Sequence, residues 1–434
     1  MYKKFVVSVQ IESSRISGIV RCPPSKSYSH RATAIGSLTT GQSVINNVLI
    51  ARDTLATIRS CSLLGVRVRQ EDTTLFINGQ HSFDPPENVL DAENSGTTIR
   101  ILTAMSALVK EGYTVITGDE SLRKRPMQPI LDALKQLGVG CYSAKMNGTA
   151  PLIIKGGGIR GGLAILDGRI SSQFLSSLLM SSIFSASPVT IRIFGDQVSK
   201  PYVEATLASM KVFGVTIDYE PKLSEYYVED KRYAPTTFNV PADFSTAALI
   251  MAAGVLAGDK VKIEGLDFGL PQADKSIIEI IKMMGGKIKI DKQKGHAIVF
   301  GSCALEGGDF DLRDAPDLLP VVSILALKAK SQVKISGIGH ARFKETDRVA
   351  AISSELTKFG AIVKQDRDMI SITPPKTPKN ASLDASNDHR LFMAFTIASM
   401  ITEKSTVTNA ESVDVSYPDF IKDMTRLNAC ISTI

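Results

Sequence analysis

The sequence predicts an α/β protein of two domains, each built from three copies of one repeated unit. Three observations lead to this prediction. The chain has 434 residues, which is more than a single hydrophobic core usually serves. An amphipathic helix followed by an alternating strand or hairpin recurs about every 72 residues. Between these helices a second helix recurs at a similar interval, rich in small apolar residues and followed by a strand of the V-x-I type.

The first of the two helices ends each time in an apolar residue followed by a turn-forming residue. In P-M-Q-P-I-L-D-A-L-K-Q-L-G, Ile130, Leu134 and Leu137 fall on one helical face, and Gly138 can adopt the left-handed conformation that ends a helix. Alternation over 287–300 around a K-G turn predicts a hairpin. The six predicted helix ends are Gly65, Gly138, Gly214, Gly285, Gly360 and Asn428.

The second helix opens with polar residues and continues as Ala, Ser, Leu, Ile and Met. Such a helix can be buried on nearly all sides, which leaves its N-terminus for chemistry. Free backbone N–H groups and the positive end of the dipole bind small anions there. We call these polar helix starts openings. Their spacing in the sequence does not show whether they lie close together in space. The six predicted openings lie near Lys26, Gly96, Ser172, Asp243, Asp317 and His389.

Composition favours a globular protein that binds small anions. The net charge is +6, no block of five or six like charges occurs, and aromatic residues make up 6% with no Trp, so a nucleic-acid partner is not favoured. We expect no signal peptide, because the alternating N-terminus lacks a long apolar core, and no membrane span. The five cysteines form no C-x-x-C pair, so we expect reduced core thiols, a cytoplasmic protein and no metal site.

The segment 340–348, H-A-R-F-K-E-T-D-R, carries the strongest candidate chemistry. Glu345 lies between Lys344 and Arg348, so it could donate a proton while the two cations hold a phosphate or carboxylate. Taken alone, this spacing is more often a solvated helix start. The other helix openings make the functional interpretation stronger.

Each of those openings also has a purely structural explanation. Ser pairs are common N-caps, an Arg before Pro is often a surface charge, and a Tyr is often part of the core. Asp317 favours the helix dipole and is either a cap or a general base. A lone His is usually structural, but His389 lies beside Asp388 and Arg390. The remaining candidates are Lys26, Ser27, Arg31, Asn94, Gly96, Arg125, Ser171, Ser172, Gln173, Ser199 and Tyr202.

Nine motifs in order along the chain resemble the 5-enolpyruvylshikimate-3-phosphate (EPSP) synthase family: P-S-K-S-x-S-H-R-A, N-S-G-T-T-x-R, R-P, S-S-Q-F, S-K-P-Y, A-P-D, K-E-T-D-R, N-D-H-R and S-Y-P. The resemblance implies a two-domain inside-out α/β barrel of six βαβαββ repeats, closing on ligand. The discontinuous domain would hold residues 1–24 and 243–434, and the continuous one 25–242. It implies a monomer of the shikimate pathway of aromatic amino acid biosynthesis, without metal or other cofactor.

The implied reaction transfers the enolpyruvyl group of phosphoenolpyruvate to the 5-hydroxyl of shikimate 3-phosphate and releases phosphate. By resemblance, Asp317 takes the hydroxyl proton, Glu345 protonates the methylene carbon, and Lys26 assists. Shikimate 3-phosphate would be held by Lys26, Ser27, Arg31, Ser171, Ser172, Gln173, Ser199, Tyr202, Asp317 and Lys344. Phosphoenolpyruvate would be held by Lys26, Asn94, Gly96, Arg125, Gln173, Arg348 and Arg390.

Two positions depart from the family pattern, and two other functions stay open. Val415 stands where many members carry Lys, and His340 where others often carry Asn, so we expect a raised Michaelis constant for phosphoenolpyruvate. One alternative is the related transferase acting on UDP-N-acetylglucosamine, whose mobile loop usually carries a Cys that the R-K-R-P segment lacks. The other is a non-catalytic anion or RNA-end binder, which a steep salt dependence would reveal.

Overall fold

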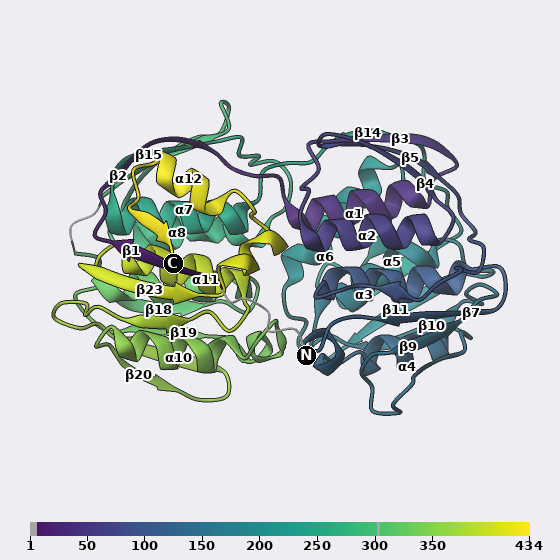
Figure 1. The fold of residues 1–434 in the computed structure, drawn as a ribbon. Coiled ribbons are helices and arrows are strands. Elements are labelled where there is room, and N and C mark those ends of the chain that lie inside the picture. Colours follow the sequence, from purple (N-terminus) through teal and green to yellow (C-terminus); the bar gives the residue numbers. More distant parts are fainter. Residues whose placement is uncertain (1–6, 302–303) are drawn as a thin grey trace. The chain divides into compact units, whose positions relative to one another are not determined.

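The computed structural model describes residues 7–301 and 304–434, which form two compact units. Unit 1 combines Met1–Pro23 with Ala242–Ile434, and unit 2 is Pro24–Pro241. Each unit contains three four-stranded sheets among the described residues (Figure 1). The strand pattern expected over 1–6, and Cys303, lie outside the described residues.

Unit 2 contains three repeats of two helices and four strands. The first comprises α1 (Lys26–Ser37), β3 (Gly41–Asn46), α2 (Arg52–Leu63), β4 (Arg67–Glu71), β5 (Thr74–Gly79) and β14 (Thr237–Asn239). The second comprises β6 (Leu90–Asp91), α3 (Gly96–Met105), β7 (Tyr113–Thr117), α4 (Gln128–Gln136), β8 (Cys141–Ser143) and β9 (Leu152–Lys155). The third comprises β10 (Gly162–Asp167), α5 (Ser172–Ser182), β11 (Val189–Phe194), α6 (Lys200–Val212), β12 (Asp218–Tyr219) and β13 (Glu225–Val228).

Unit 1 repeats the same pattern. Its first repeat comprises β2 (Ile16–Arg21), α7 (Phe244–Ala257), β15 (Gly258–Glu264), α8 (Ile277–Met283), β16 (Lys287–Asp291) and β17 (His296–Phe300). The second comprises β18 (Gly308–Asp311), α9 (Leu319–Leu325), β19 (Val333–Ser336), α10 (Arg348–Lys358), β20 (Ile362–Gln365) and β21 (Met369–Thr373). The third comprises β22 (Ser382–Asp384), α11 (His389–Ser399), β23 (Lys404–Thr408), α12 (Phe420–Arg426), β24 (Ile431–Thr433) and β1 (Ser8–Glu12).

Every sheet has one topology, with the first two strands of the repeat parallel and the hairpin antiparallel to the second strand. In unit 2, for example, β6 runs parallel to β7, and β9 and β8 follow antiparallel. Strands remote in sequence complete three of the sheets: β14 pairs with β3, β2 with β15, and β1 with β23 and β24. The predicted βαβαββ repeat, three per unit, is confirmed.

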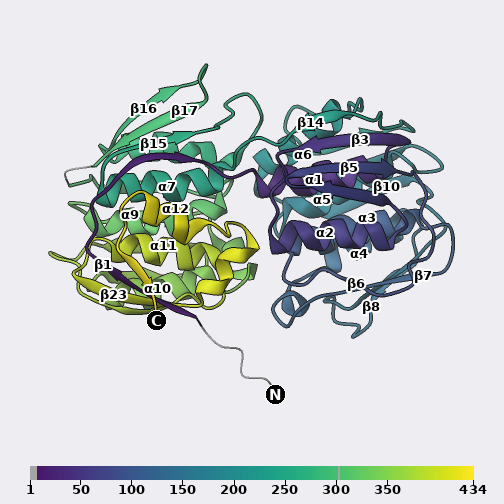
Figure 2. The ribbon, with the colours of Figure 1, turned by 45° about the horizontal axis from the view of Figure 1, so that its top comes forward.

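The two predicted helix classes take the expected places. The residues that end the amphipathic helices all have positive φ: Gly65, Gly138, Gly214, Gly285, Gly360 and Asn428. The second helices form the interior of each unit, and all residues of α7 and α11 are buried. In unit 1 α7, α9 and α11 contact one another, and in unit 2 α3 contacts α1 and α5. Figure 2 shows the interior helices with strands outside them, as the inside-out barrel requires.

Among the described cysteines, three follow the prediction of buried core thiols and one does not. Cys22, Cys61 and Cys141 are buried thiols, as expected. Cys430 is exposed, because it lies in the loop after α12 rather than on the helix face that packs inward. In the described part of the chain, no helix has the length and apolar character needed to cross a membrane.

Candidate active site

The predicted openings all lie at helix starts in the structure. α1 begins at Lys26, α3 at Gly96, α5 at Ser172 and α11 at His389. Asp243 is the N-cap of α7 and accepts a hydrogen bond from the Ser245 N–H at 2.9 Å. Asp317 lies in a 3₁₀ turn, Pro316–Leu318, that leads into α9. Polar side chains at these starts are therefore positioned by the repeat itself.

In unit 1 three carboxylates, one of them from the 340–348 segment, surround Arg348, whose side chain is 1% exposed. Its Nε donates to Asp388 at 2.7 Å, its Nη1 to Asp317 at 2.8 Å and its Nη2 to Glu345 at 2.6 Å. The segment is thus not a solvated helix start. Burial opposes the charge of Arg348, but the three carboxylates outweigh it and raise its pKa.

Asp317 is the second centre of this cluster, because it faces three cations. Beside Arg348 it contacts Arg390 Nη2 at 2.9 Å and Lys344 Nζ at 3.6 Å. Its side chain is 14% exposed, so one part of it reaches solvent. Asp317 and Glu345 have different cation neighbours. In such a pair of carboxylates one can act as a general base and the other as a general acid.

Two further titratable residues of unit 1 neighbour this cluster. Burial, followed by the charge of Asp317, raises the pKa of Asp274 to about 7, and the Ser245 hydroxyl donates to Asp274. Burial, followed by the charge of Lys344, lowers the pKa of His340 to about 4. His340 is therefore neutral at neutral pH and adds no cation to the cluster.

In unit 2 Lys26 is held at the start of α1 by a buried carboxylate. Its Nζ lies 3.1 Å from Asp53 Oδ2, and the Asp53 residue is 4% exposed. Ser25 caps the same helix by accepting from the Tyr28 N–H. The ammonium of Lys26 is thereby fixed in direction, and a fixed cation binds an anion at a lower entropic cost.

Arg31 takes a structural position that its predicted role did not suggest. It is 1% exposed, and its Nε, Nη1 and Nη2 donate to Thr206 Oγ1, to the Ser27 carbonyl and to the Tyr202 carbonyl at 2.8, 3.0 and 2.9 Å. Burial lowers its pKa to about 10. Arg31 therefore fastens α1 to α6 and brings together three of the predicted residues.

The start of α3 brings Asn94, Gly96 and Arg125 together. Arg125 Nη2 donates to Asn94 Oδ1 at 2.9 Å, and Asn94 Nδ2 donates to Asp119 Oδ2 at 2.7 Å. A Cβ on Gly96 would lie 2.7 Å from Arg125 Nη1, so only glycine leaves the guanidinium where it is. This is the close approach that the N-S-G-T motif predicted.

Gln173 connects α5 to α3. Its Oε1 accepts from Arg100 Nη1 at 2.7 Å, and its Nε2 donates to Thr97 Oγ1 at 3.0 Å. Ser171 caps α5 by accepting from the Gln173 N–H at 3.3 Å. The uncharged S-S-Q set is therefore adjacent to the α3 opening.

The remaining predicted residues of unit 2 lie at the starts of α5 and α6. Ser172 is buried in the first turn of α5. Ser199 precedes α6 with φ of 57°, a left-handed conformation that a serine seldom adopts. Tyr202 in the first turn contributes its carbonyl to Arg31.

Among the polar residues that hold these groups, Asp53 was missed from the sequence, whereas Arg100 and Asp388 stand in the predicted helix openings and only their partners were missed. Asp53 and Arg100 act through partners 27 and 73 positions away in the chain, and no local pattern marks such pairs. Asp388 stands in the N-D-H-R motif, where its place as N-cap of α11 was readable, but its bond to Arg348 was not.

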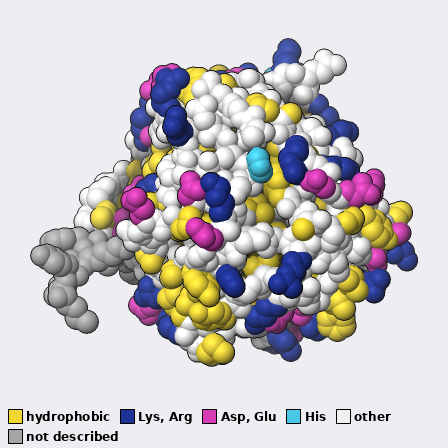
Figure 3. Space-filling view, turned by 90° about the vertical axis from the view of Figure 1, so that its right-hand side faces the viewer, with side chains coloured by type: hydrophobic (Ala, Val, Ile, Leu, Met, Phe, Trp, Pro, Cys, Tyr) yellow, Lys and Arg dark blue, Asp and Glu magenta, His cyan; other side chains and the backbone are white. Residues whose placement is uncertain are grey.

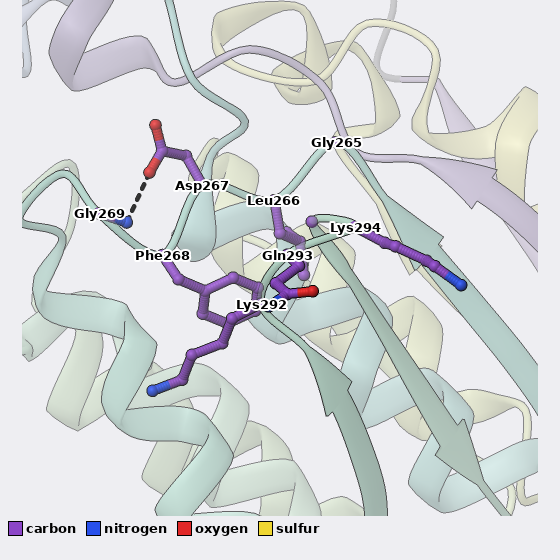
Figure 4. Close-up of a pocket in the computed structure, with 9 residues that line it drawn as sticks. Gly265, Leu266, Asp267, Phe268, Gly269, Lys292, Gln293 and Lys294 are labelled. Atoms are coloured by element: carbon purple, nitrogen blue, oxygen red, sulfur yellow. Dashed lines mark hydrogen bonds between the residues drawn. The ribbon is translucent and has the colours of Figure 1, made fainter.

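One surface pocket lies in unit 1 apart from these residues. It has a volume of about 620 Å³ and is lined by the loop 265–269 and the turn 292–295. Figure 4 shows Lys292 and Lys294 extending in different directions rather than toward a common point. None of the predicted site residues lines it.

Comparisons with known proteins cover nearly the whole chain. A family model described as EPSP synthase (3-phosphoshikimate 1-carboxyvinyltransferase) matches residues 11–424. A 3-phosphoshikimate 1-carboxyvinyltransferase of Nitrosopumilus maritimus is 42% identical over 97% of this chain and 99% of its own. The same-named protein of Methanocaldococcus jannaschii is 41% identical over 97% and 98%.

Solved structures agree with the observed fold. An EPSP synthase from Acinetobacter baumannii superposes with a TM-score of 0.82 at 25% identity, covering 99% of this chain and 100% of that one. An enolpyruvyl transferase from Streptomyces tendae shares the fold, with a TM-score of 0.81 at 16% identity and 99% coverage of each chain. The resemblance and the enzyme class inferred from the motifs are confirmed, and the chain belongs to the EPSP synthase family, the 3-phosphoshikimate 1-carboxyvinyltransferases.

Proposed function

We propose that the residues around Arg348 catalyse the transfer of the enolpyruvyl group from phosphoenolpyruvate to the 5-hydroxyl of shikimate 3-phosphate. The observation that carries this proposal is the meeting of two carboxylates, Asp317 and Glu345, on one buried arginine. Lys344 and Arg390 contact Asp317 as well. Two anionic substrates repel each other, so a site for both needs cations of this kind.

Asp317 acts as the base in the addition step. The 5-hydroxyl oxygen attacks C2 of phosphoenolpyruvate as Asp317 accepts the hydroxyl proton. Glu345 gives a proton to the C3 methylene, which becomes a methyl group, and a tetrahedral ketal forms. Glu345 then takes a proton back from that methyl group while the C2–O bond to phosphate breaks, so the enolpyruvyl ether and inorganic phosphate leave.

The acid role of Glu345 requires a change from the arrangement described above. Its carboxylate lies 2.6 Å from Arg348 Nη2, a contact that is strongest while the carboxylate is charged. The carboxylate or phosphate of phosphoenolpyruvate competes for the same guanidinium. Binding therefore releases Glu345 from Arg348 and allows it to carry the proton that the addition needs.

Unit 2 supplies most of the proposed binding groups. Ser27, Arg31, Ser171, Ser172, Gln173, Ser199 and Tyr202, with Lys344 of unit 1, serve shikimate 3-phosphate. Asn94, Gly96, Arg125 and Gln173, with Arg348 and Arg390 of unit 1, serve phosphoenolpyruvate. Lys26 serves both. The hydrogen bonds that link Asn94 to Arg125 and Gln173 to Arg100 support the second set.

The proposal extends to a monomeric cytoplasmic enzyme that works without metal or organic cofactor. The surface drawn in Figure 3 carries Lys and Arg interspersed with Asp and Glu, which does not favour an RNA-end binder. The names of the relatives favour shikimate 3-phosphate over UDP-N-acetylglucosamine as acceptor.

The test measures inorganic phosphate after mixing the protein with both substrates. We expect release only when shikimate 3-phosphate and phosphoenolpyruvate are both present, and none when UDP-N-acetylglucosamine replaces the first. Asp317→Asn keeps the shape of the side chain but removes the base, so turnover should fall about 100-fold or more. Release from phosphoenolpyruvate alone, or unimpaired turnover in Asp317→Asn, would contradict the proposal.

A further inference from the structure

A fully buried chain of hydrogen bonds in unit 2 is not used by the proposed reaction. His30 Nδ1 lies 2.7 Å from Thr57 Oγ1, which lies 2.7 Å from Thr98 Oγ1. The Thr98 hydroxyl reaches the Asp53 carbonyl at 3.2 Å and Ser95 Oγ at 2.7 Å. The chain therefore joins α1, α2 and the first turn of α3.

The Thr98 hydroxyl has one proton, which goes either to the Asp53 carbonyl or to Ser95 Oγ. In both arrangements Thr98 accepts from the Thr57 hydroxyl, and Thr57 in turn accepts from the Nδ1–H of His30. The Nε2 atom of His30 is left as an acceptor; it is buried and has no hydrogen bond within the described residues. Burial, followed by the charges of Lys26 and Arg31, lowers the pKa of His30, which fits this neutral form.

At Thr98 the chain branches to two residues next to the proposed site, Ser95 and Asp53. Ser95 is the N-cap of α3 and accepts from the Thr98 N–H at 3.2 Å, between Asn94 and Gly96 in the sequence. Asp53 holds Lys26 through its carboxylate. The chain is therefore connected to the groups proposed to bind phosphoenolpyruvate without contacting the substrate itself.

We propose that His30 is a positioning residue that, through Thr57 and Thr98, holds the opening of α3 in the geometry needed to bind phosphoenolpyruvate. The inference rests on the proposed role of Asn94, Gly96 and Arg125. α1 is fastened independently, because Arg31 makes two hydrogen bonds to α6 and Ser29 Oγ accepts from the Leu49 N–H at 3.0 Å. Breaking the chain therefore displaces α3 rather than α1.

Thr57→Val tests this inference, because valine has the same shape without the hydroxyl. It leaves the Nδ1–H of His30 without an acceptor and Thr98 without a donor, and a buried polar group left unpaired drives a local shift. We expect the Michaelis constant for phosphoenolpyruvate to rise about 5-fold or more, with that for shikimate 3-phosphate unchanged. Thr57→Ser restores the hydroxyl and should restore the constant.

Thr114→Val is the matched control. Thr114 Oγ1 is a buried hydroxyl of the same unit that makes no hydrogen bond in the described part of the chain. Its removal should leave both Michaelis constants unchanged. A second pair of variants covers the case in which Thr57→Val does not fold. His30→Leu should raise the Michaelis constant for phosphoenolpyruvate. His30→Asn should not, because it keeps an amide donor near the place of Nδ1.

The outcomes separate this inference from the proposed site. If Thr57→Val and His30→Leu lower only the urea midpoint of unfolding, or raise both Michaelis constants equally, the chain is structural and the inference is overturned. Gly96→Ala and Arg125→Ala are measured in the same assay. If these two also leave the constant for phosphoenolpyruvate unchanged, the proposed site itself fails.

Discussion

Gly96→Ala gives the sharpest test of how unit 2 binds phosphoenolpyruvate. The added Cβ would lie 2.7 Å from Arg125 Nη1 and 3.3 Å from Arg100 Nη1. The first contact is too short to persist, so the flexible end of Arg125 moves and its 2.9 Å bond to Asn94 is lost. The backbone does not oppose the substitution, because Gly96 is not among the glycines with positive φ.

The two consequences differ in size. Alanine is preferred over glycine in a helix by up to about 1 kcal/mol, so the free energy of unfolding should change little. A charged hydrogen bond is worth about 1.5 to 3 kcal/mol, and its loss from the bound state raises the Michaelis constant for phosphoenolpyruvate about 10- to 150-fold. Steady-state phosphate release with saturating shikimate 3-phosphate measures this constant.

Two controls make the result specific. Gly36→Ala adds a Cβ to α1 that meets a side-chain carbon of Ile77 at 3.3 Å and no cation, so both Michaelis constants should stay unchanged. In an Arg125→Ala background Gly96→Ala should add little, because both changes act on one guanidinium. An unchanged constant for phosphoenolpyruvate in Gly96→Ala, or additive effects in the double variant, would refute this reasoning.

Three further predictions concern unit 1. Glu345→Ala should keep both substrates bound but lose about 3 to 5 kcal/mol of transition-state stabilisation, measured as kcat, and full turnover would reassign the acid. Val415→Lys should lower the Michaelis constant for phosphoenolpyruvate, whereas Val415→Met, similar in length but uncharged, should not; equal constants in both would remove the argument from charge. His340 has a pKa of about 4 in the folded state against 6.5 in the unfolded chain. Between these two values only the unfolded chain gains a proton, so the free energy of unfolding decreases as the pH falls from about 6.5 to 4, by at most about 3 kcal/mol. Urea unfolding of the natural chain and of His340→Asn should therefore diverge below pH 6.5, and parallel curves would contradict the shift.

The sequence by itself determined the repeat and the boundaries within it. Helix periodicity, strand alternation and a left-handed residue at a helix end are local properties, so Gly138 and Asn428 could be interpreted without knowing what they pack against. The polar openings were local as well, which is why Gly96 and His389 mark helix starts in the structure. The motif order then identified the family, since it covers nearly the whole chain.

Only the tertiary structure decided which charges meet. Arg348 contacts Asp317 and Asp388, 31 and 40 positions away, and Lys26 contacts Asp53, 27 positions away. The packing of whole repeats sets these pairs, and no periodicity within one repeat records them. The same holds for β1, β2 and β14, which complete sheets far along the chain, because strand pairing depends on backbone hydrogen bonds that any sequence can make.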